Sequence, residues 1–179
     1  RVHGMRQSGA MVNETPLPIT APDSEAATAM WRDYVAAHPA HTSAESPTIE
    51  AFGDSASVAD TLLHLVMHGP KRATASLVIE YTEEGDALPR IGGHWVVCDG
   101  SGHPRIIVRT TELRISDFAS VDAAFAWDEG EGDRSLEEWR AGHSKYWERT
   151  RAARGELFDR TSEIVLERFR VVWPPEFAD

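Results

Sequence analysis

The sequence predicts a small mixed α+β fold, in which short strands alternate with helices and the sheet curls into a barrel. Three observations favour this class. The chain has 179 residues, which suits one domain with a buried core. Segments with the period of a helix alternate with segments of period two, and an apolar strand lies near the end. Because the strands are short, an open sheet would leave exposed edges, which closure would remove.

The chain is expected to form a flexible N-terminal arm followed by one domain. Residues 1–21 show no apolar period, contain glycine and proline, and lack the apolar core of a secretory signal. The domain is assigned to residues 22–179, with a helical part at about 22–69 and a barrel with further helices at about 70–175.

Two helices are predicted before residue 70. The first begins at Pro22-Asp23-Ser24-Glu25, whose second or third residue can cap backbone amides, and ends before His38-Pro39. A polar connection follows, over residues 39–54. The second helix begins at the capping-box sequence Ser57-Val58-Ala59-Asp60 and ends at Gly69. Its apolar stripe is expected to consist of Val58, Leu62, Leu65 and Val66.

Further along, the apolar period changes to two. Residues 73–81 alternate small or apolar with more polar side chains, which predicts a strand with one buried face. Trp95–Cys98 and Arg105–Thr111 are predicted to form a β-hairpin around Asp99-Gly100-Ser101-Gly102, because glycine accepts positive φ in tight turns. The last strand is predicted over Ser162–Trp173.

The junction between the second helix and the next strand holds Gly69-Pro70-Lys71-Arg72-Ala73-Thr74-Ala75-Ser76. A partly desolvated Lys71 can act as a general base for the Thr74 hydroxyl or for a water. A carboxylate such as Glu131 can hold the ammonium or shuttle the proton. On spacing alone, a solvated lysine near an ordinary strand threonine is the favoured interpretation, since such pairs are common.

A second polar segment runs from Asp128 to Trp139 and holds a cluster of carboxylates. Residues 122–127 are expected to connect into it, and Ser135 to cap a helix that runs to about Ala153. Acids before a helix are favoured by its dipole and can form a simple solvated turn. No metal site is expected, because the spacing lacks the glutamate at the twelfth position of a calcium loop.

Charge and composition limit the possible functions. The formal net charge of −11 opposes broad DNA binding, so contact with nucleic acid would be confined to a local basic pocket. No apolar run approaches the ~20 residues that span a bilayer, and the single Cys98 suits a reducing cytoplasm. No cofactor is expected, because the sequence lacks a phosphate loop, a dinucleotide fingerprint and paired zinc-binding cysteines.

Both polar segments resemble known motifs. Gly69–Ser76 resembles the G-x-K-x-x-T signature of the ASCH domain, a small β-barrel superfamily related to the PUA RNA-binding domains. Glu129–Arg140, followed by His143 and Tyr146, resembles the E-G-E-G-D-x-S-L-x-x-W-R-x-x-H signature of its longer bacterial branch. The resemblance covers roughly residues 28–173. It implies a β-barrel with helices around a cleft in which the motif lysine, threonine and acid converge.

The resemblance also assigns roles. Lys71 and Thr74 match the motif lysine and threonine, and Glu131 is the closest match to the acid, with Glu129 as the alternative. Family members have been assigned RNA binding, ribonuclease activity and, in a shorter branch, hydrolysis of N4-acylated cytidines by a lysine-threonine-glutamate set. The candidate substrate-binding residues are Arg72, Ser76, Trp127, which could stack on a base, Glu129, Ser135 and Arg140.

Three functions follow from the resemblance. In a metal-independent ribonuclease acting on single-stranded RNA, Lys71 and Arg72 would hold the phosphate and Ser135 would hydrogen-bond the substrate. In an amidohydrolase, Thr74 activated by Lys71 would attack the acyl carbonyl of an N4-acylated cytidine, a neutral modified nucleoside that suits an acidic protein. The third function is non-catalytic binding of RNA or a nucleotide. The long-branch motif places the ribonuclease slightly ahead.

Overall fold

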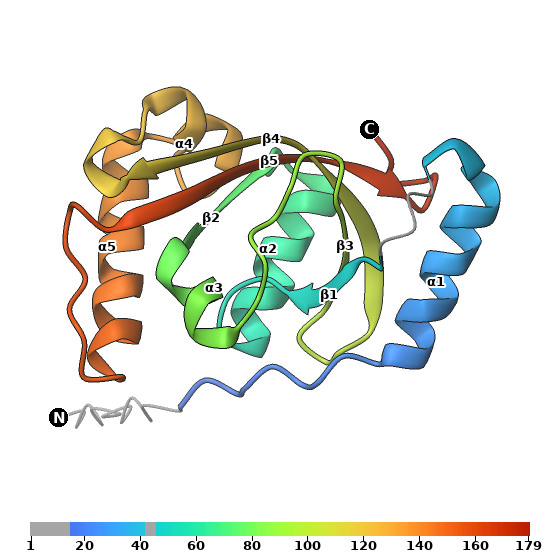
Figure 1. The fold of residues 1–179 in the computed structure, drawn as a ribbon, viewed down its shortest axis with the longest axis horizontal. Helices are drawn as coiled ribbons and strands as arrows, with labels where there is room; N and C mark the ends of the chain where they lie inside the picture. The colour runs from blue at the N-terminus through green and yellow to red at the C-terminus, as the bar shows by residue number, and fades with distance from the viewer. Residues whose placement is uncertain (1–14, 42–45) are drawn as a thin grey trace, which may run out of the picture.

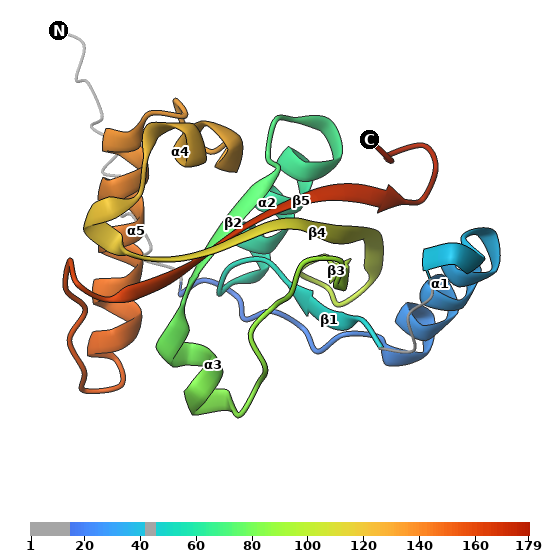
Figure 2. The same ribbon diagram turned by 45° about the horizontal axis from the view of Figure 1, so that its top comes forward.

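Five strands form one curled sheet (Figure 1). The computed structural model describes residues 15–41 and 46–179. The strands are β1 (Thr48–Ala51), β2 (Ala73–Leu77), β3 (His94–Cys98), β4 (Pro104–Asp117) and β5 (Glu163–Trp173). Their order in the sheet is β1-β3-β4-β5-β2, with β1 parallel to β3 and the other neighbours antiparallel. The predicted mixed α+β class is confirmed, and the sheet curls into a half-barrel (Figure 2).

Several helices surround this sheet. They are α1 (Ser24–Ala37), α2 (Ala56–His68), α3 (Val78–Glu84), α4 (Ala123–Glu129) and α5 (Leu136–Ala152), with short 3-10 turns at Pro39–His41 and Phe118–Ser120. The caps predicted for two of them are confirmed. The Asp23 carboxylate accepts from the Ala26 amide at 2.9 Å, and the Ser135 hydroxyl accepts from the Glu138 amide at 3.1 Å. None of the helices in the described residues is both long enough and apolar enough to cross a membrane.

The hairpin and the last strand are also confirmed. β3 and β4 pair around a turn in which Gly102 has φ of 85°. β4 continues to Asp117 and pairs with β5 over most of its length, so these two long strands form the centre of the sheet. The edge strand β2 joins this centre through β5.

Two predicted connections are wrong because they contain short regular elements. Residues 48–51 form β1, whose four residues are too few to show a period but pair with β3. Residues 123–129 form α4, which begins where the Asp122 carboxylate accepts from the Phe125 amide at 2.8 Å.

The strand predicted over residues 73–81 is wrong beyond Leu77, where α3 begins. The Glu80 carboxylate accepts from the Leu77 amide at 3.1 Å, which satisfies a free amide at the helix start. The Tyr81 hydroxyl then lies 2.9 Å from the Ser76 hydroxyl. The chain therefore turns across the end of the sheet instead of continuing along it.

The apolar stripe predicted for α2 is wrong in part. The buried residues are Ala59, Leu63 and Val66, whereas Val58 is 38% exposed. The N-cap of the helix is Ser55, two residues before the predicted cap. The buried face lies about one residue further along the helix than expected, since Ala59 and Leu63 are buried in place of Val58 and Leu62.

Helices cover both faces of the sheet. Consecutive strand residues point to opposite faces, so Val97 packs in the cluster with Leu63 of α2, whereas Val96 packs in the cluster with Tyr34 of α1. α4 and α5 pack around β2 and β5 through Phe125 and other side chains of a third cluster. Of the predicted arm, residues 1–14 lie outside the described residues. The Leu17 carbonyl accepts from the Ala56 amide at 2.9 Å.

Candidate functional site

Lys71 is buried just before β2, between two glutamates. It is 1% exposed, and its Nζ lies 2.5 Å from Glu131 Oε1 and 3.6 Å from Glu129 Oε1. The ring centroid of Phe52 lies 5.6 Å from the same nitrogen. A buried ammonium is costly unless it is paired, and the two carboxylates provide that pairing. The two polar segments of the sequence therefore meet at Lys71.

The acidic segment approaches Lys71 closely because Gly130 ends α4. Gly130 has φ of 71°, and a Cβ built on it would lie 2.7 Å from the Lys71 backbone nitrogen. The Arg72 amide donates to the Asp128 carbonyl at 2.8 Å across the same contact. A side chain at position 130 would push the two backbones apart.

Replacing Gly130 by alanine is therefore expected to lower the free energy of unfolding by about 1–3 kcal/mol, since left-handed backbone and steric overlap both oppose the Cβ. Gly142 of α5 is the matched control, because a Cβ there meets no heavy atom within 4 Å. Gly142→Ala is expected to change stability by no more than about 1 kcal/mol, in the stabilising direction. Urea denaturation of both variants measures the difference, and equal shifts would contradict the close contact.

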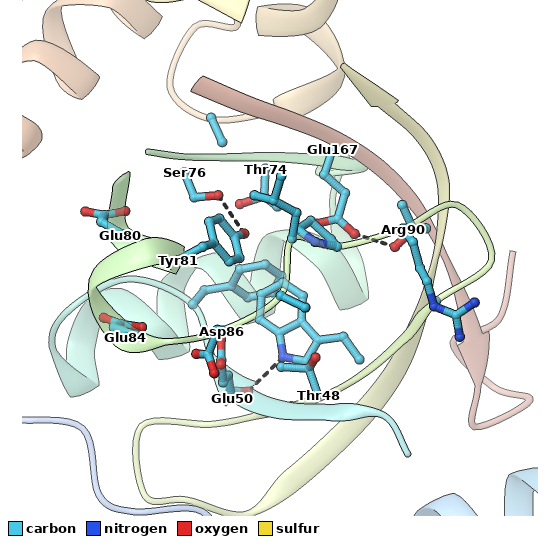
Figure 3. A pocket seen from close by; sticks show the side chains of 18 of the residues that line it. Thr48, Glu50, Thr74, Ser76, Glu80, Tyr81, Glu84, Asp86, Arg90 and Glu167 are labelled. Carbon is cyan, nitrogen blue, oxygen red and sulfur yellow. Dashed lines mark hydrogen bonds between the residues drawn. The ribbon is translucent and has the colours of Figure 1, made fainter. Parts of the chain in front are cut away.

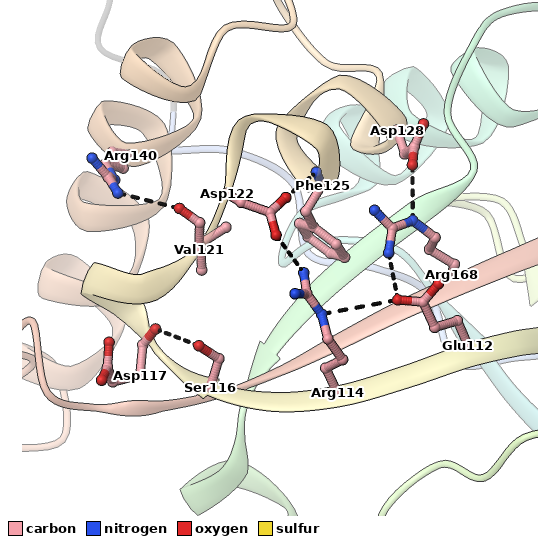
Figure 4. Close-up of polar contacts among 10 residues, drawn as sticks. All are labelled: Glu112, Arg114, Ser116, Asp117, Val121, Asp122, Phe125, Asp128, Arg140 and Arg168. Atoms are coloured by element: carbon pink, nitrogen blue, oxygen red, sulfur yellow. Dashed lines mark hydrogen bonds and ion pairs between the residues drawn. The ribbon is translucent and has the colours of Figure 1, made fainter.

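Ion pairs hold α4 against the two long strands (Figure 4). Arg168 of β5 donates to Asp128 at 2.8 Å and to Glu112 of β4 at 2.6 Å. Arg114 of β4 donates to Asp122, the cap of α4, at 3.0 Å. Both ends of α4 are therefore tied to the sheet, which positions the acidic segment that follows it.

Glu129 is the buried member of the acidic pair. It is 2% exposed, accepts a hydrogen bond from Trp139 Nε1, and lies 3.3 Å from His143 Nε2. Burial alone would raise the pKa of Glu129, but His143, Lys71 and the Trp139 hydrogen bond lower it to about 2. Burial likewise opposes protonation of His143, but the Glu129 carboxylate outweighs this and raises the His143 pKa. Glu129 is thus a fixed anion behind Lys71, while Glu131, at 35% exposure, is the partner that reaches solvent.

A cavity of about 800 Å³ opens between β1, β2 and α3 (Figure 3). Thr74 and Ser76 line it from β2, and Glu167 lines it from β5. Phe52 also lines it, and its ring centroid lies 5.6 Å from Lys71 Nζ, so Lys71 lies next to the cavity although it is not part of the lining. The aromatic side chains that line the cavity are those of Phe52, Tyr81, Trp95, Tyr146 and Trp147.

The cavity is strongly acidic. Its carboxylates are those of Glu50, Glu80, Glu84, Asp86 and Glu167. Among its lining residues, which all belong to the described ranges, Arg90 supplies the one guanidinium and there is no lysine. Burial raises the pKa of Glu80 and of Glu167, although a hydrogen bond to each carboxylate partly opposes the rise. The field in the cavity therefore disfavours a polyanion.

Five of the six predicted substrate-binding residues lie outside this lining, and Ser76 is the one within it. Glu129, one of the five, pairs with Lys71 instead. Arg72 donates through Nε and Nη2 to Asp179, at 3.0 and 2.6 Å, and through Nη1 to two backbone carbonyls. Ser135 caps α5. Arg140 donates to the carbonyls of Ala119 and Val121.

Trp127 is the last of the five. It lies on α4, is 55% exposed, and its ring centroid lies 3.7 Å from the Arg134 guanidinium carbon. In contrast, Lys71, Glu129 and Glu131 converge, and Thr74 lines the cavity. The roles that the family resemblance assigns to Lys71, Thr74, Glu129 and Glu131 stay predictions.

Glu167, Thr110 and Trp95 line the cavity but were not among the predicted site residues. Glu167 had a sequence signal, because it is an acid that follows the apolar run Ile164-Val165-Leu166 within a strand. Trp95 and Thr110 had none, since both fit ordinary strand positions. Across residues 15–41 and 46–179, no group of three or more histidine, cysteine or acidic side chains is placed to hold a metal ion.

The curled mixed sheet, with a lysine before its edge strand and an acidic segment against that lysine, defines a PUA-like domain. The ASCH domain family matches residues 48–173, and the chain belongs to this family. The PUA-like fold of this family is often linked to RNA binding.

Two solved structures are similar to this chain. An ASCH domain from Lactobacillus crispatus JV V101 is 28% identical, with a TM-score of 0.73 over 84% of this chain and 96% of that chain. A protein from Enterococcus faecalis V583 is also 28% identical, with a TM-score of 0.75 over 83% of this chain and 89% of that chain. No curated protein matches this chain.

Proposed function

We propose that this protein is an amidohydrolase that removes the acyl group from N4-acylated cytosine, with Thr74 as nucleophile. The observation that carries the proposal is the position of Thr74 in the lining of an acidic cavity of about 800 Å³. Small-molecule sites commonly enclose roughly 300–1,000 Å³, and an acylated nucleoside is of that class. It is also uncharged, so the carboxylates of the lining do not oppose its entry.

The aromatic lining favours a nucleobase. Trp95 and Phe52 lie with ring centroids 4.6 Å apart, and Tyr81 faces the same space from α3. Flat apolar side chains stack on bases of any sequence. The lining therefore has both the size and the chemistry to hold a cytosine ring beside Thr74.

Cleavage of the RNA backbone is less favoured by the same geometry. A ribonuclease would present cations to phosphate, but Lys71 is paired with two carboxylates and Arg72 with Asp179. The Ser135 hydroxyl already accepts a hydrogen bond from the Glu138 amide of its own helix. These contacts support our placing the amidohydrolase ahead of the ribonuclease, which the sequence motif alone places slightly first.

In the proposed reaction, Glu131 accepts a proton from the Lys71 ammonium along their 2.5 Å contact. The Lys71 amine then takes the proton of the Thr74 hydroxyl, and Thr74 Oγ adds to the acyl carbonyl carbon. The bond between this carbon and N4 breaks, and the leaving nitrogen takes up a proton. Water finally attacks the threonine ester, which releases the acid and restores the hydroxyl. Glu129 stays ionised throughout and keeps Lys71 in place.

The experiment that tests this proposal offers the purified protein three substrates in parallel, followed by chromatography. They are N4-acetylcytidine, an RNA oligonucleotide with one N4-acetylcytidine, and the same oligonucleotide unmodified. We expect cytidine from the free nucleoside. Deacetylation of the modified oligonucleotide as well would extend the substrate to RNA. Fragments of the unmodified RNA, without release of cytidine in the first reaction, would overturn the proposal.

A further inference from the structure

Glu167 places a second carboxyl group beside Thr74. In the antiparallel pair of β2 and β5, Thr74 lies directly opposite Glu167. Side chains of directly opposed residues lie on the same face, with Cβ atoms about 4.5–5.5 Å apart. Both side chains point into the cavity (Figure 3). The pair therefore joins the proposed nucleophile to an acid that the reaction above does not use.

The surroundings of Glu167 suit a neutral carboxylic acid. The residue is 8% exposed, and it has no ion pair within the described part of the chain. Its one hydrogen-bond partner there is Thr110 of β4, whose hydroxyl donates to Oε1. Burial raises the Glu167 pKa, while the Thr110 hydrogen bond lowers it. A carboxylic acid that keeps its proton can give it to a leaving group.

We propose that Glu167 is the general acid of this site and donates a proton to N4 of cytosine as the acyl bond breaks. The inference rests on the proposed function. When the tetrahedral adduct on Thr74 collapses, the electron pair of the C–N bond goes to N4, and N4 takes the Glu167 proton. Cytidine leaves neutral, Thr74 carries the acyl ester, and Glu167 is a carboxylate. The attacking water then gives its proton to Glu167, while the Thr74 oxygen regains one from Lys71, and Glu131 returns its proton to Lys71.

Replacement of Glu167 by glutamine separates this role from a structural one. The amide oxygen of glutamine still accepts from Thr110, but the side chain has no acidic proton to give. We expect kcat on N4-acetylcytidine to fall about 100-fold or more, with KM changed by no more than about twofold. With p-nitrophenyl acetate, the first-turnover burst of p-nitrophenol should persist in this variant, because that leaving group needs no proton. The later turnovers should be slower than in the parent, because Glu167 also accepts the proton of the water that attacks the ester.

Glu163→Gln is the matched control. Glu163 lies on the same strand as Glu167, but it is exposed and does not line the cavity. We expect kcat of this variant to stay within about threefold of the parent, since the 10²-fold and larger losses belong to proton transfer. Thermal melting of both variants checks that each is folded.

The dependence of kcat on pH also distinguishes the two roles, because a purely structural residue would not change it. The cavity around Glu167 also presents other titratable or charged groups, which are those of Glu50, Glu80, Tyr81, Glu84, Asp86, Arg90, His94 and Tyr146. Since Glu167 must be protonated to act as an acid, kcat should fall as the pH rises through its pKa, which gives the pH profile an alkaline limb. Glu167→Gln should lack this limb. Thr110→Val keeps the acid but removes the hydrogen bond that lowers its pKa, so the alkaline limb should move to higher pH.

The outcomes separate the two proposals. If the parent protein leaves N4-acetylcytidine intact, the proposed function is wrong and this inference falls with it. If the parent is active, but Glu167→Gln keeps kcat within about threefold and both variants keep the parent's alkaline limb, the general-acid role alone is wrong. If Glu167→Gln does not fold, the unshifted limb of Thr110→Val is sufficient to overturn the inference.

Discussion

Lys71→Met is expected to reduce hydrolysis of N4-acetylcytidine by about 10³-fold or more and also to destabilise the fold. The rate falls because the variant has no amine to take the Thr74 proton, and loss of a general base typically costs 10²–10⁴-fold. Stability falls because Lys71 is 1% exposed and pairs with both Glu129 and Glu131. Removing one partner of a buried ion pair commonly lowers the free energy of unfolding by about 3–5 kcal/mol.

The companion variant Glu131→Gln separates the chemical from the structural effect. Glu131 is 35% exposed, and Glu129 still pairs with Lys71 when Glu131 is neutral. We expect a rate loss of at least about 10²-fold, with a stability loss smaller than that of Lys71→Met, because the buried ammonium keeps Glu129 as a partner. Steady-state kinetics and urea denaturation measure the two quantities. A fully active Lys71→Met protein would refute the assigned base, whatever its stability.

Thr74→Val is expected to abolish the amidohydrolase activity, by about 10⁴-fold or more, while the fold stays intact. Valine has nearly the shape of threonine and suits an edge strand, so the free energy of unfolding should change by less than about 1 kcal/mol. The rate falls because no hydroxyl is left to form the acyl ester, and a site without its nucleophile retains only binding and electrostatic effects.

Thr74→Ser is the control for this substitution, because it keeps a hydroxyl at the same strand position. Its kcat on N4-acetylcytidine should exceed that of Thr74→Val by at least about 100-fold. A ribonuclease that uses the substrate's own 2′-hydroxyl gives a different pattern, since its cleavage of RNA would survive in Thr74→Val. Hydrolysis of N4-acetylcytidine at the parental rate in the valine variant would exclude Thr74 as the nucleophile.

Local signals account for much of what the sequence predicts correctly. The caps of α1 and α5 depend on hydrogen bonds within four residues, and the β3-β4 hairpin on glycines in its turn. The strand predicted through Tyr81 was wrong because alternation continues into α3, where the Glu80 cap decides the structure. β1 is stabilised by its pairing with β3, which no local pattern reveals.

The part of the site that could be predicted is the contact between the two motif segments. Lys71 and Glu131 are 60 residues apart, and only the resemblance of both segments to one family indicated that they meet. Arg72 shows the limit of that reasoning. Its guanidinium binds Asp179, 107 residues away, at a position that neither motif contains. Glu167 was missed because its significance comes from register, which places it opposite Thr74.

The most direct test of the central claim is the mass of the protein during its first turnover of N4-acetylcytidine. Acid quenching at successive times, followed by intact-mass and peptide analysis, detects an acyl ester if one forms. The proposed mechanism predicts a gain of one acetyl group on the peptide that contains Thr74, in step with the release of cytidine, and no gain in Thr74→Val. Release of cytidine with an unchanged protein mass, or an acetyl group on another residue, would contradict Thr74 as the nucleophile.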